Sequence, residues 1–160
     1  MKDIKIFFAE PKEFIQQNIE SLTGITGLYF IFLKTSKIKY PFKNSRLIYI
    51  GMSEKRTNSI GNRLTNHYNG KSGNVGLANY RKAEKLFFTH INFEMIKEIW
   101  KPSIEDLESY FILDFVENYG VYPICNNKTG FEILNRDLEI KLDIDWHYFE
   151  WGGMEDECWS

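Results

Sequence analysis

A carboxylate at position 108 falls on a helix face that the sequence predicts to be buried. At about 100° per residue, the helix expected from Ser103 to Gly120 carries Glu108 inside its apolar stripe. That stripe consists of Ile104, Leu107, Phe111, Ile112 and Phe115, whereas Glu105, Asp106, Asp114 and Glu117 lie on its flank or away from it. An unpartnered buried carboxylate is costly, so Glu108 needs a cation, a hydrogen-bond cluster or a raised pKa. A divalent metal satisfies this need, and so does a salt bridge to an arginine or a side chain that reaches water.

A guanidinium and an imidazole share one face of a second predicted helix. Arg63 and His67 are four residues apart, and Ile60 and Leu64 determine which side of this helix packs on the rest of the protein. Arginine is suited to phosphate oxygens and histidine to proton transfer near neutral pH. The pair therefore fits phosphate chemistry, although two exposed side chains on a surface helix have the same spacing.

Two tyrosines lie within apolar runs that read as strands. Tyr29 belongs to Gly27–Leu33 and Tyr49 to Leu47–Ile50, and a basic loop containing Pro41 separates the two runs, which predicts a hairpin with a long connection. Tyrosines at such positions are core residues more often than catalysts. Gly27 and Gly51 bracket the hairpin.

The remaining pattern predicts an α+β fold in which helices flank a small antiparallel sheet. The hairpin and a third apolar stretch at Leu86–Ile96 supply the sheet, with helical structure left open at one end of that stretch. Ser59 and Ser103 are placed to cap helices that end at Gly70 and Gly120. Before the hairpin we expect a short strand through Ile4, Ile6 and Phe8 and an amphipathic helix over residues 10–23, with Pro11 in its first turn; residues 69–76 read as a loop.

The chain of 160 residues has the size of one domain. Its expected core covers residues about 24–130, and residues 131–160 add a strand, which alternates from Leu138 to Trp146, and an acidic tail from Gly152. No apolar run approaches the roughly 20 residues that cross a bilayer. The N-terminus has acidic residues on both sides of a short apolar stretch and no small-residue cleavage site, so it does not resemble a signal peptide. Two distant cysteines suit a reducing compartment, and we expect a cytoplasmic protein without membrane association.

Charge is distributed very unevenly along the chain. Residues 34–85 hold twelve of the 20 Lys and Arg residues and only two of the 22 Asp and Glu residues, although the net charge is −2. Such a basic region is typical of phosphate neutralisation, and solvated surface loops are the alternative. The expected contacts to a DNA backbone are Lys34, Lys37, Lys39, Lys43, Arg46, Lys55, Arg56, Lys71, Arg81 and Lys82.

The order of these features resembles the GIY-YIG nuclease family. The resemblance extends from Gly27 to Asn127 and rests on Gly-Leu-Tyr at 27–29, Tyr-Ile-Gly at 49–51, the helical arginine and histidine, Glu108, and Pro-Ile-Cys-Asn at 123–126. The arginine–histidine pair is similar to the restriction-endonuclease branch of the family. Three features depart from the family pattern: Gly-Leu-Tyr replaces Gly-Ile-Tyr, the hairpin loop is long, and a few extra residues separate Gly51 from Arg63.

The resemblance implies a role for each residue. Tyr29 and Tyr49 are the hairpin tyrosines, Arg63 the helical arginine, Glu108 the ligand of one divalent metal and Asn126 the late asparagine. His67 would assist Tyr29. We therefore expect hydrolysis of DNA with one Mg²⁺ or Mn²⁺ ion, and DNA is favoured over RNA.

In this mechanism each group has one task. Arg63 would donate to the non-bridging phosphate oxygens, and Tyr29 would act as a base if its proton passes to His67. Tyr49 would orient water or phosphate, and Asn126 would hold the geometry through hydrogen bonds. The sequence contains no recognisable reader of bases, so target choice would depend on loops, a second copy of the chain or a partner subunit.

Two other interpretations remain. In a different nuclease architecture, Glu139 and Lys141 would supply a metal ligand and a lysine from the late strand. Alternatively, the chain is a catalytically silent module that binds nucleic acid or a protein, and its acidic C-terminal segment covers the basic region or docks on a partner.

Overall fold

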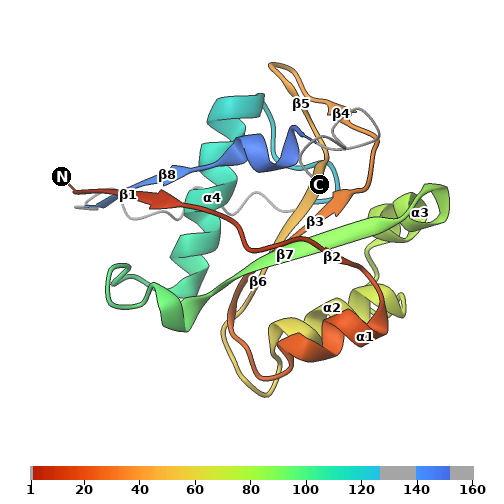
Figure 1. Ribbon diagram of the computed structural model, residues 1–160, viewed down its shortest axis with the longest axis horizontal. Helices are drawn as coiled ribbons and strands as arrows, with labels where there is room; N and C mark the ends of the chain where they lie inside the picture. Colours follow the sequence, from red (N-terminus) through yellow and green to blue (C-terminus); the bar gives the residue numbers. More distant parts are fainter. Residues whose placement is uncertain (1, 127–139, 152–160) are drawn as a thin grey trace.

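The computed structural model describes residues 2–126 and 140–151. Its main sheet has four antiparallel strands in the order β2-β7-β3-β6: β2 (Lys12–Glu13), β7 (Leu86–Asn92), β3 (Gly27–Leu33) and β6 (Leu47–Ser53) (Figure 1). All seven residues of β3 are buried, as expected of an apolar strand with neighbours on both edges and helices on both faces. The α+β class and the hairpin are confirmed.

The long connection of the hairpin contains a smaller hairpin of its own. Strands β4 (Ile38–Lys39) and β5 (Asn44–Ser45) pair with each other beyond the end of β3 and β6. They project from one end of the sheet, at the top of Figure 1.

Two predicted helices form with the expected caps. In α2 (Ile60–Tyr68) the Ser59 side chain accepts the Asn62 amide, and in α4 (Ile104–Tyr119) Ser103 Oγ accepts the Asp106 amide at 3.1 Å. Gly120 ends α4 in the left-handed region with φ 97°.

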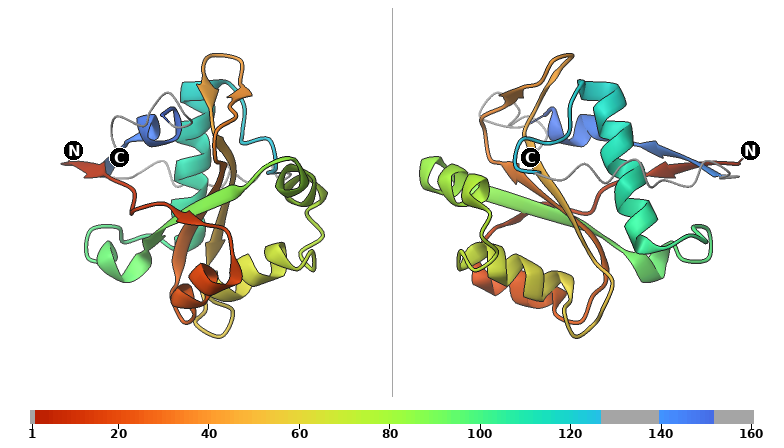
Figure 2. Two further views of the ribbon diagram at one scale, coloured as in Figure 1. Left: turned by 45° about the vertical axis from the view of Figure 1, so that its right-hand side comes forward. Right: turned by 180° about the vertical axis from the view of Figure 1, so that it is seen from behind.

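These helices cover opposite faces of the sheet (Figure 2). Leu28, Phe30 and Ile50 pack with the apolar stripe of α4, whereas Tyr29, Ile31 and Ile48 pack with Ile60 and Leu64 of α2. Neighbouring residues of a strand point to opposite faces, so β3 contributes to both cores. In β6 the register shifts where Ile31 pairs with Tyr49 and Phe32 with Leu47, and Ile48 and Ile50 therefore belong to different cores.

The predicted N-terminal helix over residues 10–23 is largely wrong. Residues 12–13 form β2, and only α1 (Gln16–Ile19) and the 3₁₀ helix η1 (Glu20–Leu22) are helical. The Phe14 amide donates to the Leu86 carbonyl at 2.9 Å, so the segment that contains Pro11 extends the sheet edge instead of starting a helix. A long-range backbone pairing overrides the local helical pattern here.

The predicted loop over residues 69–76 is also too long. Asn74 caps a helix, α3 (Val75–Ala83), through a hydrogen bond from the Leu77 amide. The sequence does not reveal α3 because Leu77 is its one buried residue, and a single apolar contact leaves no helical period to detect.

The two ends of the described chain meet in a separate parallel pair. Strand β1 (Lys2–Ile6) lies beside β8 (Ile140–Ile144), and the 3₁₀ helix η4 (Trp146–Phe149) follows. The late strand therefore ends before Trp146, and the third strand of the main sheet ends at Asn92, where the 3₁₀ helix η2 (Phe93–Met95) begins. The start of the late strand at Leu138 and the tail from Gly152 lie outside the described residues.

Candidate active site

The register of the hairpin places both tyrosines on the face covered by α2. Tyr29 pairs with Gly51, and Ile31 pairs with Tyr49, so the two phenols occupy neighbouring positions with ring centroids 6.0 Å apart. A Cβ at Gly51 would lie 2.3 Å from Cζ of Tyr29. The Tyr29 ring thus lies across Gly51, and only glycine leaves room for it.

Helix α2 brings His67 to these phenols. Nε2 of His67 lies 3.0 Å from the Tyr29 hydroxyl, and the imidazole centroid is 5.1 Å from that of Tyr49. Ile60 and Leu64 are fully buried against the sheet. His67 follows Leu64 by three residues, so it lies on the same side of α2 and faces the hairpin.

Burial sets the protonation of this cluster. Burial raises the pKa of Tyr29 well above 10 and also raises the pKa of Tyr49. At Tyr29 the neighbouring Tyr49 phenol, and then the Glu108 charge, raise the pKa further. Burial and the Arg63 charge lower the pKa of His67 to about 4. At pH 7 both phenols are protonated and the imidazole is neutral.

Arg63 reaches the same cluster from one turn earlier in α2. Its charge favours the ionised form of both tyrosines and disfavours the protonated form of His67. Its Nε is buried and, within the part of the chain that the structure describes, has no hydrogen-bond partner. A buried N–H without a partner is costly, so this donor is available to an anion.

Glu108 approaches from α4, on the opposite side of the sheet. It is 3% exposed, as the helical wheel predicts, and its charge raises the pKa of both Tyr29 and Tyr49. Since β6 is the edge strand of the sheet, a helix that packs beside it can present a carboxylate around that edge.

Asn126 supports the edge strand. Its Oδ1 accepts the Ile50 amide at 2.9 Å and its Nδ2 donates to the Ile50 carbonyl at 2.8 Å, and the Cys125 amide donates to the Ile48 carbonyl. The segment from Pro123 to Asn126 thus lies along the outer edge of β6. The Asn126 side chain and the Cys125 amide occupy hydrogen-bonding positions that a further strand would otherwise fill.

Sequence reasoning missed two residues beside the cluster. Ser72 Oγ lies 2.8 Å from Nδ1 of His67, and His90 of β7 pairs directly with Tyr29, so its side chain is on the same face. Burial, and then the charge of Lys12, lower the pKa of His90. Only the strand register could have revealed His90, and nothing local marks Ser72.

Nine of the ten expected DNA contacts are exposed, but Arg46 is not. It is 5% exposed, donates to the carbonyls of Leu33, Lys34 and Tyr148, and lies over the Phe32 ring. Its assignment to a DNA backbone is wrong, because the guanidinium holds the hairpin to η4.

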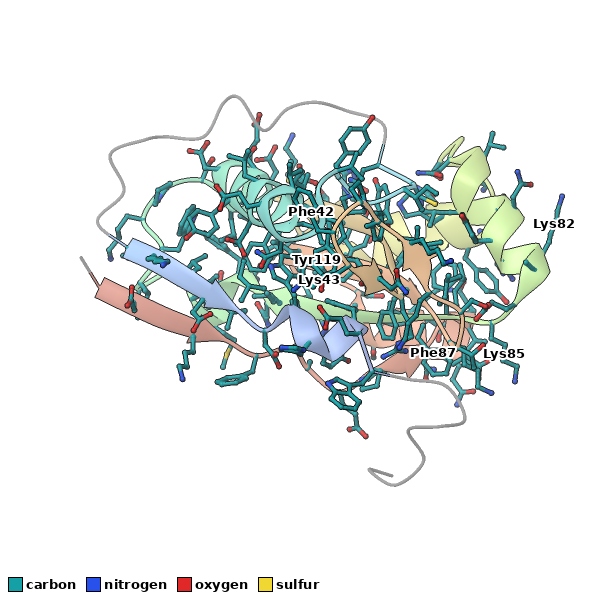
Figure 3. The ribbon with its side chains drawn as sticks, turned by 90° about the horizontal axis from the view of Figure 1, so that it is seen from above. Phe42, Lys43, Lys82, Lys85, Phe87 and Tyr119 are labelled. Atoms are coloured by element: carbon teal, nitrogen blue, oxygen red, sulfur yellow. The ribbon has the colours of Figure 1, made fainter. Side chains whose placement is uncertain are left out.

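The exposed cations form separate groups. Lys43 pairs with Glu150 at 3.4 Å and lies over the Tyr119 ring, whereas Lys82 projects from α3 (Figure 3). Between α2 and α3 a cavity of about 340 Å³ opens beside His67 and is lined by Tyr68, Arg81 and Lys82 among others. Of the expected contacts, Arg81 and Lys82 thus share a cavity with the site.

A metal at this site would have few protein ligands. Residues 2–126 and 140–151 contain no group of three or more His, Cys, Asp or Glu side chains that could hold an ion. One buried carboxylate fits Mg²⁺, which keeps several waters and binds through one or two carboxylates plus phosphate oxygens. The alternative metal residue, Glu139, lies outside the described residues, and Lys141 is exposed on β8.

Comparison of the chain with protein-family models, curated proteins and solved structures finds no match. Among the described residues, no helix combines the length and the apolar character needed to cross a bilayer.

Proposed function

We propose that this protein is a metal-dependent endonuclease of the GIY-YIG type that hydrolyses DNA in the cytoplasm. The observation that carries the proposal is the convergence of Tyr29, Tyr49, His67, Arg63 and Glu108 from two strands and two helices. Tyr29 and His67 lie within hydrogen-bond distance, their rings and that of Tyr49 are in contact, and the charges of Arg63 and Glu108 act on both phenols.

Arg63 recognises the scissile phosphate. Its Nε has no hydrogen-bond partner among residues 2–126 and 140–151, and its positive charge lies next to two neutral phenols, so an anion is favoured there. A guanidinium donates to two non-bridging oxygens at once. These bonds strengthen as charge builds on the phosphate in the transition state.

Tyr29 and His67 move the proton. The attacking water gives a proton to the Tyr29 oxygen while the Tyr29 proton passes to Nε2 of His67, so no free phenolate forms. The hydroxide attacks phosphorus, the bond to the 3′ oxygen breaks, and that oxygen takes a proton from solvent. Tyr49 orients the water or the phosphate beside Tyr29.

Glu108 would hold the metal, which would take phosphate oxygens and waters as its other ligands. When bound, Mg²⁺ or Mn²⁺ supplies positive charge that stabilises the phosphate and the departing 3′ oxygen. Glu108 is 3% exposed, and this burial restricts the conformations open to its carboxylate.

The exposed cations of residues 34–85, without Arg46, supply contacts to the DNA backbone. Target choice is left to loops, a second copy of the chain or a partner subunit, since none of the described elements forms a reader of bases.

Replacing Glu108 tests the proposal. We expect Glu108→Gln, which keeps the side-chain volume, to lower Mg²⁺-dependent nicking of supercoiled plasmid by about 100-fold or more, because one electrostatic contact to the transition state is worth that much. Gel analysis measures nicking, and circular dichroism checks the fold. Glu117→Gln, which makes the same change at an exposed position of the same helix, is the matched control and should nick normally.

Unchanged nicking by Glu108→Gln would contradict the metal assignment. Wild-type protein that binds DNA but cleaves neither plasmid, linear duplex nor single strands with Mg²⁺ or Mn²⁺ would favour the catalytically silent module instead.

A further inference from the structure

The loop after α2 folds back over the end of that helix. The amides of Lys71 and Ser72 both donate to the Asn66 carbonyl, at 2.8 and 3.2 Å. Gly70 and Gly73 make the reversal possible, since each has φ 76°, which side chains rarely adopt. Ser72 is thereby brought against His67, although both glycines and Ser72 are exposed.

Ser72 Oγ is held from both sides. It accepts the Asn74 amide at 3.2 Å and lies 2.8 Å from Nδ1 of His67, whose other nitrogen lies 3.0 Å from the Tyr29 hydroxyl. Tyr29, His67 and Ser72 therefore form one hydrogen-bonded chain that runs from the buried phenol to the surface loop.

A neutral imidazole carries one proton, so the two ends of this chain are coupled. A proton on Nδ1 leaves the Nε2 lone pair free for the phenol O–H, whereas a proton on Nε2 removes that acceptor. The Tyr29 residue is 1% exposed, and burial keeps its hydroxyl protonated. That proton can be donated to Nε2 of His67 or to the neighbouring Tyr49 hydroxyl, and the proposed reaction uses the path to Nε2. Donation from Tyr29 to Nε2 requires the Nδ1–H form, and Ser72 Oγ lies where it can accept that proton.

We propose that Ser72 is a positioning residue that accepts the Nδ1–H of His67 and thereby keeps Nε2 as the proton acceptor for Tyr29. Its Oγ has a lone pair for this bond beside the one used by the Asn74 amide. The inference rests on the proposed function, because proton acceptance from Tyr29 is the step in which His67 takes part. Ser72 itself touches neither substrate nor metal.

The tautomer of His67 tests this role independently of any activity. Long-range ¹H–¹⁵N spectra at pH 7 distinguish a protonated from an unprotonated ring nitrogen, and His67→Gln identifies the His67 signals among the 3 histidines of the chain. We expect wild type to show Nδ1–H. Ser72→Ala should move the signals toward Nε2–H, Ser72→Thr should keep Nδ1–H because it retains the hydroxyl, and Asn79→Ala, exposed on α3, should change neither nitrogen.

The same variants then separate positioning from binding in the nicking assay. Ser72→Ala should lower kcat by about tenfold, a part of what a proton-transfer group contributes, with the KM for plasmid unchanged and activity restored in Ser72→Thr.

A wild-type protein with Nε2–H, or a Ser72→Ala variant with unchanged ¹⁵N shifts, would overturn the proposal. If the wild type cleaves no DNA, the proposed nuclease function fails, and the ¹⁵N shifts still decide whether Ser72 sets the tautomer.

Discussion

Tyr29 belongs to the core and to the candidate site at once. Its ring is 1% exposed and fills the space that the absent Gly51 side chain leaves, while its hydroxyl meets His67. Packing therefore fixes where the hydroxyl lies, and the same burial keeps it protonated. A buried phenol of this kind can lose its proton only to a neighbour such as His67.

The depressed pKa of His67 makes a prediction about stability at low pH. The folded pKa is about 4 and the ordinary value is 6.5, so between these values the unfolded chain binds a proton that the folded protein does not. The stabilising effect is complete above pH 6.5 and is lost as the pH falls toward 4. Relative to His67→Gln, wild type should lose on the order of 3 kcal/mol of unfolding free energy between pH 7 and pH 4.

Urea unfolding of both proteins across this range measures the difference. Subtracting the two curves cancels the contributions of the carboxylates and of His90, which also has a lowered pKa. Parallel curves would show that His67 titrates normally and is not buried against the tyrosines.

At the scale of elements, the candidate site depends on the position of β6 at the edge of the sheet. Helix α2 lies on one face and α4 on the other, yet Arg63 and Glu108 act on the same phenols. A central strand in place of β6 would separate the two helices by the full sheet. An exposed edge would invite pairing with other chains, and here the Pro123–Asn126 segment covers it.

Asn126 should accordingly be a stability residue. Asn126→Ala removes two hydrogen bonds to Ile50 and leaves its buried backbone groups without those partners, which should cost about 2–4 kcal/mol. Asn126→Asp directs a buried carboxylate oxygen at the Ile50 carbonyl, so it should cost at least as much at pH 7 and less at a pH low enough to protonate the carboxylate. Urea unfolding measures both, with Asn79→Ala as the exposed control. A variant with full stability and no nicking would instead assign Asn126 to the chemistry.

At the scale of the molecule, the basic region of the sequence is divided among distant surfaces. Lysines of the β4–β5 hairpin lie at one end of the sheet, Lys55 and Arg56 follow β6 toward α2, and Arg81 and Lys82 line the cavity beside His67 (Figure 1). Arg81 also stacks on the Tyr68 ring, 3.8 Å from its centroid, which fixes its guanidinium at the cavity wall. A charge count along the chain cannot separate these groups.

This division predicts which cations bind DNA near the site. Arg81→Gln with Lys82→Gln should weaken binding of a short duplex and flatten the dependence of log K on log salt by about 1–2, since each phosphate contact contributes about 0.9. The pair Lys37→Gln and Lys39→Gln removes the same charge from the far hairpin and should change both quantities less. Fluorescence anisotropy at several salt concentrations measures them, and equal effects would place the backbone across the hairpin as well.

Local patterns in the sequence were enough for the hairpin, for α2 and α4 with their serine caps, and for the inward face of Glu108. Each depends on periodicity or capping within one segment, which neighbouring residues decide. The N-terminal segment, α3, the burial of Arg46 and the β1–β8 pair depended on contacts between residues far apart in the chain. Their local patterns were weak or misleading. The strands that pair with β1 and β2, and the carbonyl groups that accept the Arg46 hydrogen bonds, come close only when the protein folds. The approach of Arg63, His67 and Glu108 to the two phenols was likewise decided by the tertiary structure. The order of residues in the chain does not determine that α2 and α4 pack on opposite faces of the sheet beside the same strand.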